Sequence, residues 1–194
     1  MNSKIGSKLD ESEKQILQMM GASLLKLNNT IGNLIEVTKA QKNLEEQLEP
    51  IAIQEIVEDI KDELKLQISE SKAKIQEEFL IQELKFAKAS LRSIMYNLLS
   101  NAIKYRSPER LPVINISTFK EEEHTVLRIQ DNGLGLTQKQ EAKLFTMFKR
   151  FHRHVEGTGI GLYIVKRTIE NYGGKIQVRS KLDEGTEFKL YFHS

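Results

Sequence analysis

Four short motifs follow one another in the second half of this chain and constrain its fold more than any other feature. They are Asn97-Leu-Leu-Ser-Asn-Ala-Ile-Lys-Tyr105, Asp131-Asn-Gly-Leu-Gly135, Gly157-Thr-Gly-Ile-Gly-Leu162 and Gly185-Thr-Glu-Phe188. Each of them alone is a weak signal. In this order they supply amides, a carboxylate and glycines that expose the backbone, so the sequence predicts one site assembled from four segments.

The first motif lies on a predicted helix, residues 89–105, whose apolar positions recur at helical spacing. Asn97 and Asn101 are four residues apart and therefore project from one face, with Lys104 near that face. A hydrated magnesium ion with bound phosphates would satisfy both amides, because magnesium prefers oxygen ligands and keeps waters. The alternative is an amphipathic helix that carries two surface amides.

The second motif follows a predicted strand, residues 125–130. A carboxylate at a strand end, here Asp131, can accept a hydrogen bond from the amine of adenine. Gly133 and Gly135 would let the backbone approach the base closely. A tight turn in which Asp131 is only a local acceptor is the alternative.

The third motif leads directly into a predicted helix, residues 161–172, with Leu162, Val165 and Ile169 facing inward. Glycines at a helix start present main-chain N–H groups to an anion, and the helix dipole adds to the attraction. The spacing differs from the dinucleotide-binding and P-loop patterns, which excludes both. A purely structural glycine turn remains the alternative.

A basic, aromatic-rich stretch, residues 144–156, separates the second motif from the third. Beside a phosphate site such a stretch is typical of a lid. We expect Phe145 and Phe148 to anchor it to the core, and Arg150 to contact phosphate or an acidic partner.

Together these motifs resemble the catalytic ATP-binding domain of sensor histidine kinases, in the wider group that includes DNA gyrase, Hsp90 and MutL. The resemblance covers about residues 48–192 and implies ATP and Mg²⁺, with magnesium at Asn97 and Asn101 and catalytic roles for Asn101, Lys104 and Arg150. It implies that Tyr105 lies on the base side, Asp131 on the adenine amine, the glycines under the phosphates and Thr186 near the base. The implied nucleotide site comprises Asn97, Asn101, Lys104, Tyr105, Asp131, Gly133, Gly135, Gly157, Thr158, Gly159, Ile160, Gly161, Leu162 and Thr186.

The predicted fold class is α+β, a two-layer sandwich with a mixed or antiparallel sheet and helices on one face. Besides the elements above, the patterns predict helices at 53–64 and 138–148. They predict strands at 73–80, 113–119, 175–180 and 187–192.

The N-terminal part predicts one long helix, residues 12–47, which ends before Pro50. Its apolar positions recur about every 3.5 residues, the seam of a coiled coil or bundle: Leu17, Met20, Leu24, Leu27, Ile31, Leu34 and Thr38. We expect self-association through this seam, to a dimer or higher oligomer, rather than a helix folded back on its own domain. The expected domains are 1–48, which resembles the second helix of the dimerisation and phosphotransfer domain, and 49–194, the catalytic ATP-binding domain.

No histidine lies on the seam helix, whereas the family carries its phosphoacceptor on the first bundle helix. The histidines here are His124, His152, His154 and His193. We therefore expect a fragment of a longer protein that lacks the first helix and that binds nucleotide without autophosphorylating. Asn97 stands where gyrase and Hsp90 relatives place a water-activating glutamate, so ATP hydrolysis should be poor.

The composition argues against several kinds of partner and binding site. The 29 Lys and Arg nearly balance the 27 Asp and Glu, which argues against nucleic acid as a partner. The absence of Cys excludes disulfides and thiolate metal sites. No membrane span or signal peptide is predicted, so we expect a cytoplasmic location, with any membrane anchor in segments outside this chain.

The resemblance implies a response-regulator receiver domain as partner of the full protein. Three alternatives stay open: an anti-sigma-type serine kinase, a gyrase- or Hsp90-type ATPase, and an inactive nucleotide-binding dimerisation module.

Overall fold

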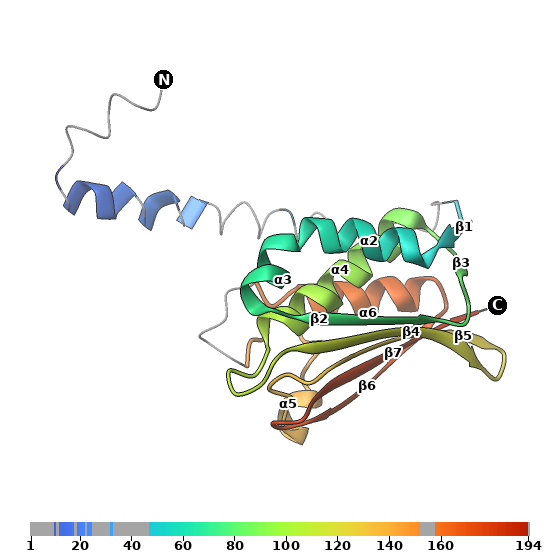
Figure 1. The fold of residues 1–194 in the computed structure, drawn as a ribbon. Coiled ribbons are helices and arrows are strands. Elements are labelled where there is room, and N and C mark those ends of the chain that lie inside the picture. Colours follow the sequence, from blue (N-terminus) through green and yellow to red (C-terminus); the bar gives the residue numbers. More distant parts are fainter. Residues whose placement is uncertain are drawn as a thin grey trace.

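The computed structural model describes residues 10, 12–17, 19–21, 23–24, 32, 47–151 and 158–193. Within the last two ranges the chain forms two layers, with the longer helices packed on one face of a twisted sheet and the short helix α5 (Gln138–Glu141) beside β6 (Lys175–Lys181) (Figure 1). The helices are α2 (Ile53–Glu63), α3 (Lys65–Ser71), α4 (Lys88–Lys104), α5 (Gln138–Glu141) and α6 (Gly161–Asn171). The strands are β1 (Glu49–Ala52), β2 (Lys74–Phe79), β3 (Glu83–Phe86), β4 (Val113–Glu121), β5 (His124–Asp131), β6 (Lys175–Lys181) and β7 (Gly185–His193).

The main sheet has the strand order β2-β4-β5-β7-β6. Strand β2 pairs with β4 in parallel, and the other neighbours are antiparallel. The predicted mixed sheet of an α+β sandwich is thereby confirmed. Strands β1 and β3 form a separate antiparallel pair.

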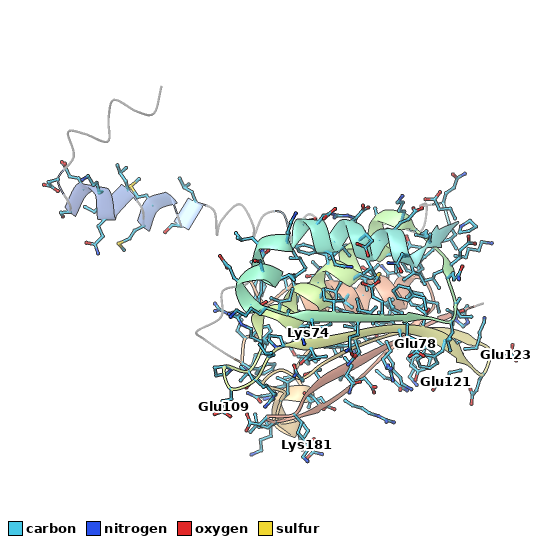
Figure 2. All side chains as sticks on the ribbon, viewed as in Figure 1. Lys74, Glu78, Glu109, Glu121, Glu123 and Lys181 are labelled. Carbon is cyan, nitrogen blue, oxygen red and sulfur yellow. The ribbon has the colours of Figure 1, made fainter. Side chains whose placement is uncertain are left out.

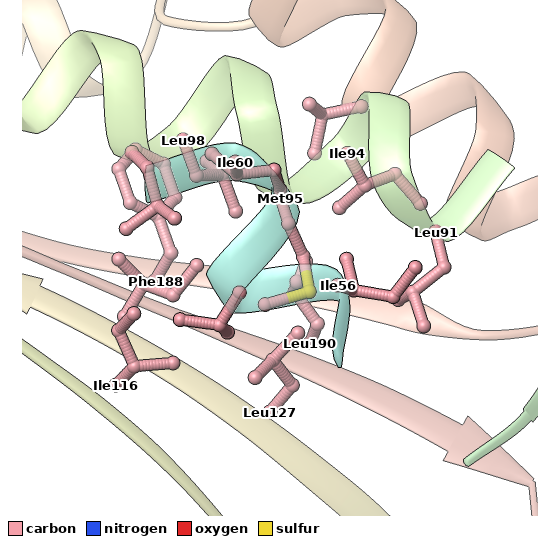
Figure 3. Packing of buried hydrophobic residues seen from close by; sticks show 14 of the residues in the cluster. Ile56, Ile60, Leu91, Ile94, Met95, Leu98, Ile116, Leu127, Phe188 and Leu190 are labelled. Atoms are coloured by element: carbon pink, nitrogen blue, oxygen red, sulfur yellow. The ribbon is translucent and has the colours of Figure 1, made fainter. Parts of the chain in front are cut away.

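The core lies between the helices and the sheet (Figure 3). Helices α2 and α4 bury one stripe each because their apolar residues recur every three or four positions. The opposing sheet residues alternate along their strands. The close-up shows Ile56, Ile60, Leu91, Ile94, Met95 and Leu98 from the helices meeting Ile116, Leu127, Phe188 and Leu190 from the sheet.

The other face of the sheet carries charged side chains such as Lys74, Glu78 and Glu121 (Figure 2). There the Nζ of Lys189 donates to the Oε2 of Glu121 at 2.8 Å. A sheet with one solvated face needs helices on the other face alone, which explains the two layers.

The prediction of a helix over residues 138–148 is wrong beyond Glu141. Thr137 and Gln140 form a capping box that starts α5. The chain then continues in tight turns, in which the N–H of Leu144 donates to the carbonyl of Glu141. Phe148 has a φ of 59°, a left-handed conformation that ends helical geometry.

The remaining predicted helices and strands of the domain are found within two residues at each end; β4 ends two residues later than predicted and β7 begins two residues earlier. Helix α3 and strands β1 and β3 were not predicted. Pro50, at which the N-terminal helical pattern is predicted to end, lies in β1.

Only part of the N-terminal seam falls within the described residues. Leu17, Met20 and Leu24 have helical geometry and are 50%, 55% and 63% exposed. Leu27, Ile31, Leu34 and Thr38 lie outside the described residues, so the seam itself stays a prediction. No helix in the described part of the chain is both long and apolar enough to cross a membrane.

Candidate functional site

Helix α4 places Asn97, the first asparagine of the first motif, beside the start of α6. The Nδ2 of Asn97 donates to the Ser93 carbonyl at 2.9 Å, so its Oδ1 is the amide atom left for other contacts. That oxygen would lie 2.2 Å from a Cβ atom built on Gly161. Only glycine permits this approach. Asn101, one turn along α4, is half-buried.

Helix α6 begins without a side-chain cap. Its N-cap residue, Ile160, is fully buried, and its side chain has no atom that could accept a hydrogen bond from the first N–H groups of the helix. Such a helix start attracts anions, since its N–H groups and its dipole both favour negative charge. Thr158 and Leu162, on either side, are half-buried.

The described part of the predicted lid lies against Gly159. A Cβ atom built on this glycine would lie 2.9 Å from the Lys149 carbonyl oxygen and 3.2 Å from the Cγ of Arg150. The structure thus brings Arg150 to the third motif. Gly157, His152 and His154 lie outside the described residues.

The two phenylalanines of this stretch differ. Phe145 is half-buried and packs against the core, which confirms its anchoring role. Phe148 is 59% exposed, so the prediction that it anchors the stretch is wrong. Its left-handed backbone, at the end of the turns after α5, accounts for the difference.

The C-terminal end of α4 meets the second motif. The Tyr105 carbonyl accepts from the N–H of Leu134 at 2.9 Å, and a Cβ atom built on Gly133 would lie 2.5 Å from that carbonyl oxygen. Burial raises the pKa of Tyr105, and the charge of Arg150 opposes this shift. Tyr105 is therefore close to both the second motif and the Arg150 guanidinium, while Lys104 is exposed on the last turn.

Asp131 is held in a hydrogen-bonded turn. Its Oδ1 accepts from the N–H of Gly133 at 2.7 Å. Burial raises the pKa of Asp131 to about 6, while hydrogen bonds from the N–H groups of Gly133 and Thr186 and the charge of Arg110 act in the opposite direction. The two main-chain N–H groups and the Arg110 charge thus partly offset the cost of burying the ionised carboxylate.

The fourth motif closes the site through strand pairing. Asp131 and Thr186 are partners across β5 and β7. The Oγ1 of Thr186 lies 2.8 Å from the Oγ of Ser180, and Gly185, with φ at 123°, packs against the Asp131 carbonyl. Gly135 packs on the Lys181 carbonyl. The register thus fixes Thr186 beside Asp131.

The sequence patterns did not identify three residues that lie near the site: Arg110, Asn132 and Ser180. Arg110 and Ser180 each contact a motif from another segment, by hydrogen bonds to main-chain or side-chain oxygens. Asn132 lies inside the second motif, where any polar residue would fit the pattern. No sequence signal distinguishes these three.

Among the described residues, no group of three or more His, Cys, Asp or Glu is arranged to hold a metal ion. The amides of Asn97 and Asn101 are oxygen donors without charge. This donor set fits a magnesium ion that keeps waters and is held mainly by phosphate oxygens.

Known proteins resemble this chain in sequence and in fold. The family model described as "Histidine kinase-, DNA gyrase B-, and HSP90-like ATPase" matches residues 86–194. Sensor protein RprX of Bacteroides fragilis is 37% identical over 102 residues, which cover 50% of this chain and 20% of RprX. Phytochrome-like protein Cph1 of Synechocystis is 30% identical over 182 residues, which cover 93% of this chain and 24% of Cph1. The chain thus spans about a quarter or less of these relatives.

Solved structures share the fold. The Acinetobacter baumannii histidine kinase AdeS superposes with a TM-score of 0.75 at 20% identity, covering 96% of this chain and 86% of that one. Full-length ShkA in complex with AMPPNP gives a TM-score of 0.77 at 20% identity, covering 96% of this chain and 40% of that one. The family match, which spans more than half of the sequence, decides the assignment. This chain belongs to the histidine kinase-, DNA gyrase B- and HSP90-like ATPase family.

Proposed function

We propose that this chain is the ATP-binding portion of a sensor histidine kinase, which transfers the γ-phosphate of Mg-ATP to a histidine. One observation carries the proposal: segments far apart in the sequence meet at one place, with Asn97 against Gly161 and Asp131 paired with Thr186. The family match and the sensor kinases among the relatives support the same reading.

In this proposal Asn97 and Asn101 hold magnesium through their amide oxygens. The metal supplies charge neutralisation and orients the phosphates when it is bound. The contact between Asn97 and Gly161 supports this role, because it places an amide oxygen beside an uncapped helix start where phosphate would bind.

Lys104 and Arg150 act on the phosphates. An imidazole nitrogen of the acceptor histidine attacks the γ-phosphorus, the bond to the bridging oxygen breaks, and ADP leaves. Such a reaction needs positioning and charge stabilisation more than covalent chemistry. Gly157, Thr158, Gly159, Ile160, Gly161 and Leu162 contribute main-chain groups and packing around the phosphates.

Asp131 accepts from the adenine amine, with Thr186 beside it and Tyr105, Gly133 and Gly135 shaping the base side. The paired register of Asp131 and Thr186 supports this arrangement. Asn97, being an amide, cannot remove a proton from water. The site should therefore conserve ATP for the histidine rather than hydrolyse it.

Residues 1–48 then serve dimerisation and residues 49–194 nucleotide binding. Exposed apolar side chains at Leu17, Met20 and Leu24 support homodimer formation through the N-terminal helix. The full protein would pass its phosphate to a response-regulator receiver domain.

Radiolabelled ATP tests the proposal. The full-length parent protein should become labelled with an acid-labile, base-stable phosphoryl group, as expected for phosphohistidine. The 194-residue chain alone should bind ATP and remain unlabelled. An acid-stable label would instead indicate a serine kinase, and absence of nucleotide binding would contradict the proposal.

A further inference from the structure

Arg110 holds the turn that carries Asp131. It lies between α4 and β4, and its Nε donates to the Asn132 carbonyl while its Nη2 donates to the Gly133 carbonyl. Both distances are 2.6 Å. The planar guanidinium fork suits two neighbouring carbonyls, which a lysine ammonium cannot match.

The same turn is fastened to this segment by a second residue. The Oδ1 of Asn132 accepts from the N–H of Val113 at 2.8 Å, and its Nδ2 donates to the Leu111 carbonyl at 3.0 Å. Within the turn, Gly133 donates its N–H to Asp131. The carbonyl side of the turn is thus held by Arg110 and its amide side by the Asp131 carboxylate, so the two contacts fix the peptide plane between them.

Arg110 also acts electrostatically on the same carboxylate. Burial disfavours the charged form of Asp131, and the Arg110 charge favours it, as do the N–H groups of Gly133 and Thr186. Arg110 therefore affects both the orientation and the ionisation of the Asp131 carboxylate, the group that faces the base in the proposed site.

We propose that Arg110 is a positioning residue for base recognition, which holds the 131–133 turn so that the Asp131 carboxylate selects adenine over guanine. The inference rests on the proposed nucleotide-binding function. Adenine presents an amine at the position where guanine presents a carbonyl oxygen. A carboxylate held in place attracts the adenine amine and repels the guanine carbonyl oxygen. A carboxylate that moves discriminates less between the two bases.

The experiment compares the 194-residue chain with Arg110→Met and Arg110→Lys variants. Arg92→Met is the matched control, because Arg92 forms an exposed ion pair with Glu63 on the helical layer. Fluorescent methylanthraniloyl-ADP and methylanthraniloyl-GDP are titrated into each protein, across a range of pH. Thermal unfolding and circular dichroism establish that each variant is folded.

The ratio of GDP to ADP dissociation constants should fall about tenfold in Arg110→Met, the size of effect that one charge-assisted contact gives. The Lys variant should be intermediate, because it restores charge without the fork. The pH midpoint of ADP binding should rise in Arg110→Met. The Arg92 control should change neither quantity.

A folded Arg110→Met variant with the wild-type ratio and pH midpoint overturns the inference, even if it unfolds at a lower temperature. Should that variant not fold, the Lys variant decides: a reduced ratio supports the inference and a wild-type ratio overturns it. A wild-type chain that binds neither probe instead overturns the proposed function, which keeps the two failures distinct.

Discussion

Gly161 lies so close to Asn97 that the β-carbon of any other residue would come within 2.2 Å of the Asn97 Oδ1. The contact joins α4, which carries the amides, to the start of α6, where the proposed site would hold the phosphates. It therefore couples the two motifs to which the proposed function assigns magnesium and phosphate binding, and the methyl group of an alanine at position 161 would disrupt it.

Gly161→Ala should weaken Mg-ATP binding about tenfold, because the Asn97 amide must rotate away from the added methyl. The measurement is a fluorescent-nucleotide titration with magnesium present. Gly21→Ala is the control, since a Cβ atom built on Gly21 has no neighbour within 4 Å. Unchanged affinity in Gly161→Ala would show that the amide does not need its present position.

Asn101→Ala should remove most of the magnesium dependence of ATP binding. Wild-type affinity should be higher with magnesium than in a chelator, whereas the variant should give nearly equal values, because a lost metal ligand matters only when the metal is present. Calorimetric titration with and without EDTA provides the measurement. Asn115→Ala on β4 is the control, and it should behave as wild type. A variant that keeps the full magnesium effect would exclude Asn101 as a ligand.

ADP binding should weaken as the pH falls through about 6. The pKa of Asp131 is raised to about 6 by burial, so below that pH the carboxylic acid is neutral and no longer an effective acceptor for an amine. Bound ADP should in turn lower the pKa of Asp131, because it favours the ionised form. Dissociation constants measured from about pH 5 to about pH 8 test this. A profile without a transition near 6 would contradict it.

Asp131 should make the unliganded protein less stable as the pH rises. Its folded pKa of about 6 exceeds the usual value of 3.8, so between these values the folded state binds the proton more tightly than the unfolded chain does. Its contribution is therefore most favourable below about pH 4 and is lost as the pH rises through about 6, a loss of at most about 3 kcal/mol. Urea unfolding of wild type and Asp131→Asn at mildly acidic and neutral pH measures the difference. The Asp131→Asn variant should lose less stability between the two pH values than wild type does. An equal loss in both proteins would assign the pH dependence to other groups.

Leu98→Ala should destabilise the domain by about 2–5 kcal/mol, because the side chain is buried between the helices and the sheet. Leu66→Ala, at a position that is 67% exposed, is the control and should change stability by less than about 0.5 kcal/mol. Denaturant unfolding compares the two. Equal effects would mean that Leu98 contributes no more to packing than an exposed leucine.

The long amphipathic helices were predictable because apolar residues spaced like Ile56, Val57 and Ile60 fall on one face of a helix but not on one face of a strand. The hairpin of β4 and β5 was predictable from two apolar runs on either side of an acidic turn. Strands β1 and β3 were not, since four residues are too few for alternation to be read. The segment after α5 has a helical apolar pattern, but its turns and the left-handed Phe148 depend on contacts with the rest of the chain.

The motifs were visible in the sequence because each is a local run of residues. Arg110 was not, because its partners lie 22 and 23 positions away and are main-chain carbonyls, which leave no mark on residue type. Ser180 was hidden for the same reason, since it meets Gly185 and Thr186 only across a strand pair.

The parallel pairing of β2 with β4 has a mechanical consequence for α4. The helix belongs to the connection between these two strands, and its two ends are tethered to different sheets: its N-terminal end follows β3, which pairs with β1, and its C-terminal end leads to β4 of the main sheet. Sliding α4 along its axis would strain both tethers. The helix that carries Asn97 and Asn101 is therefore held at both ends, and any change in the distance between these amides and a bound ligand would have to come from other segments of the chain.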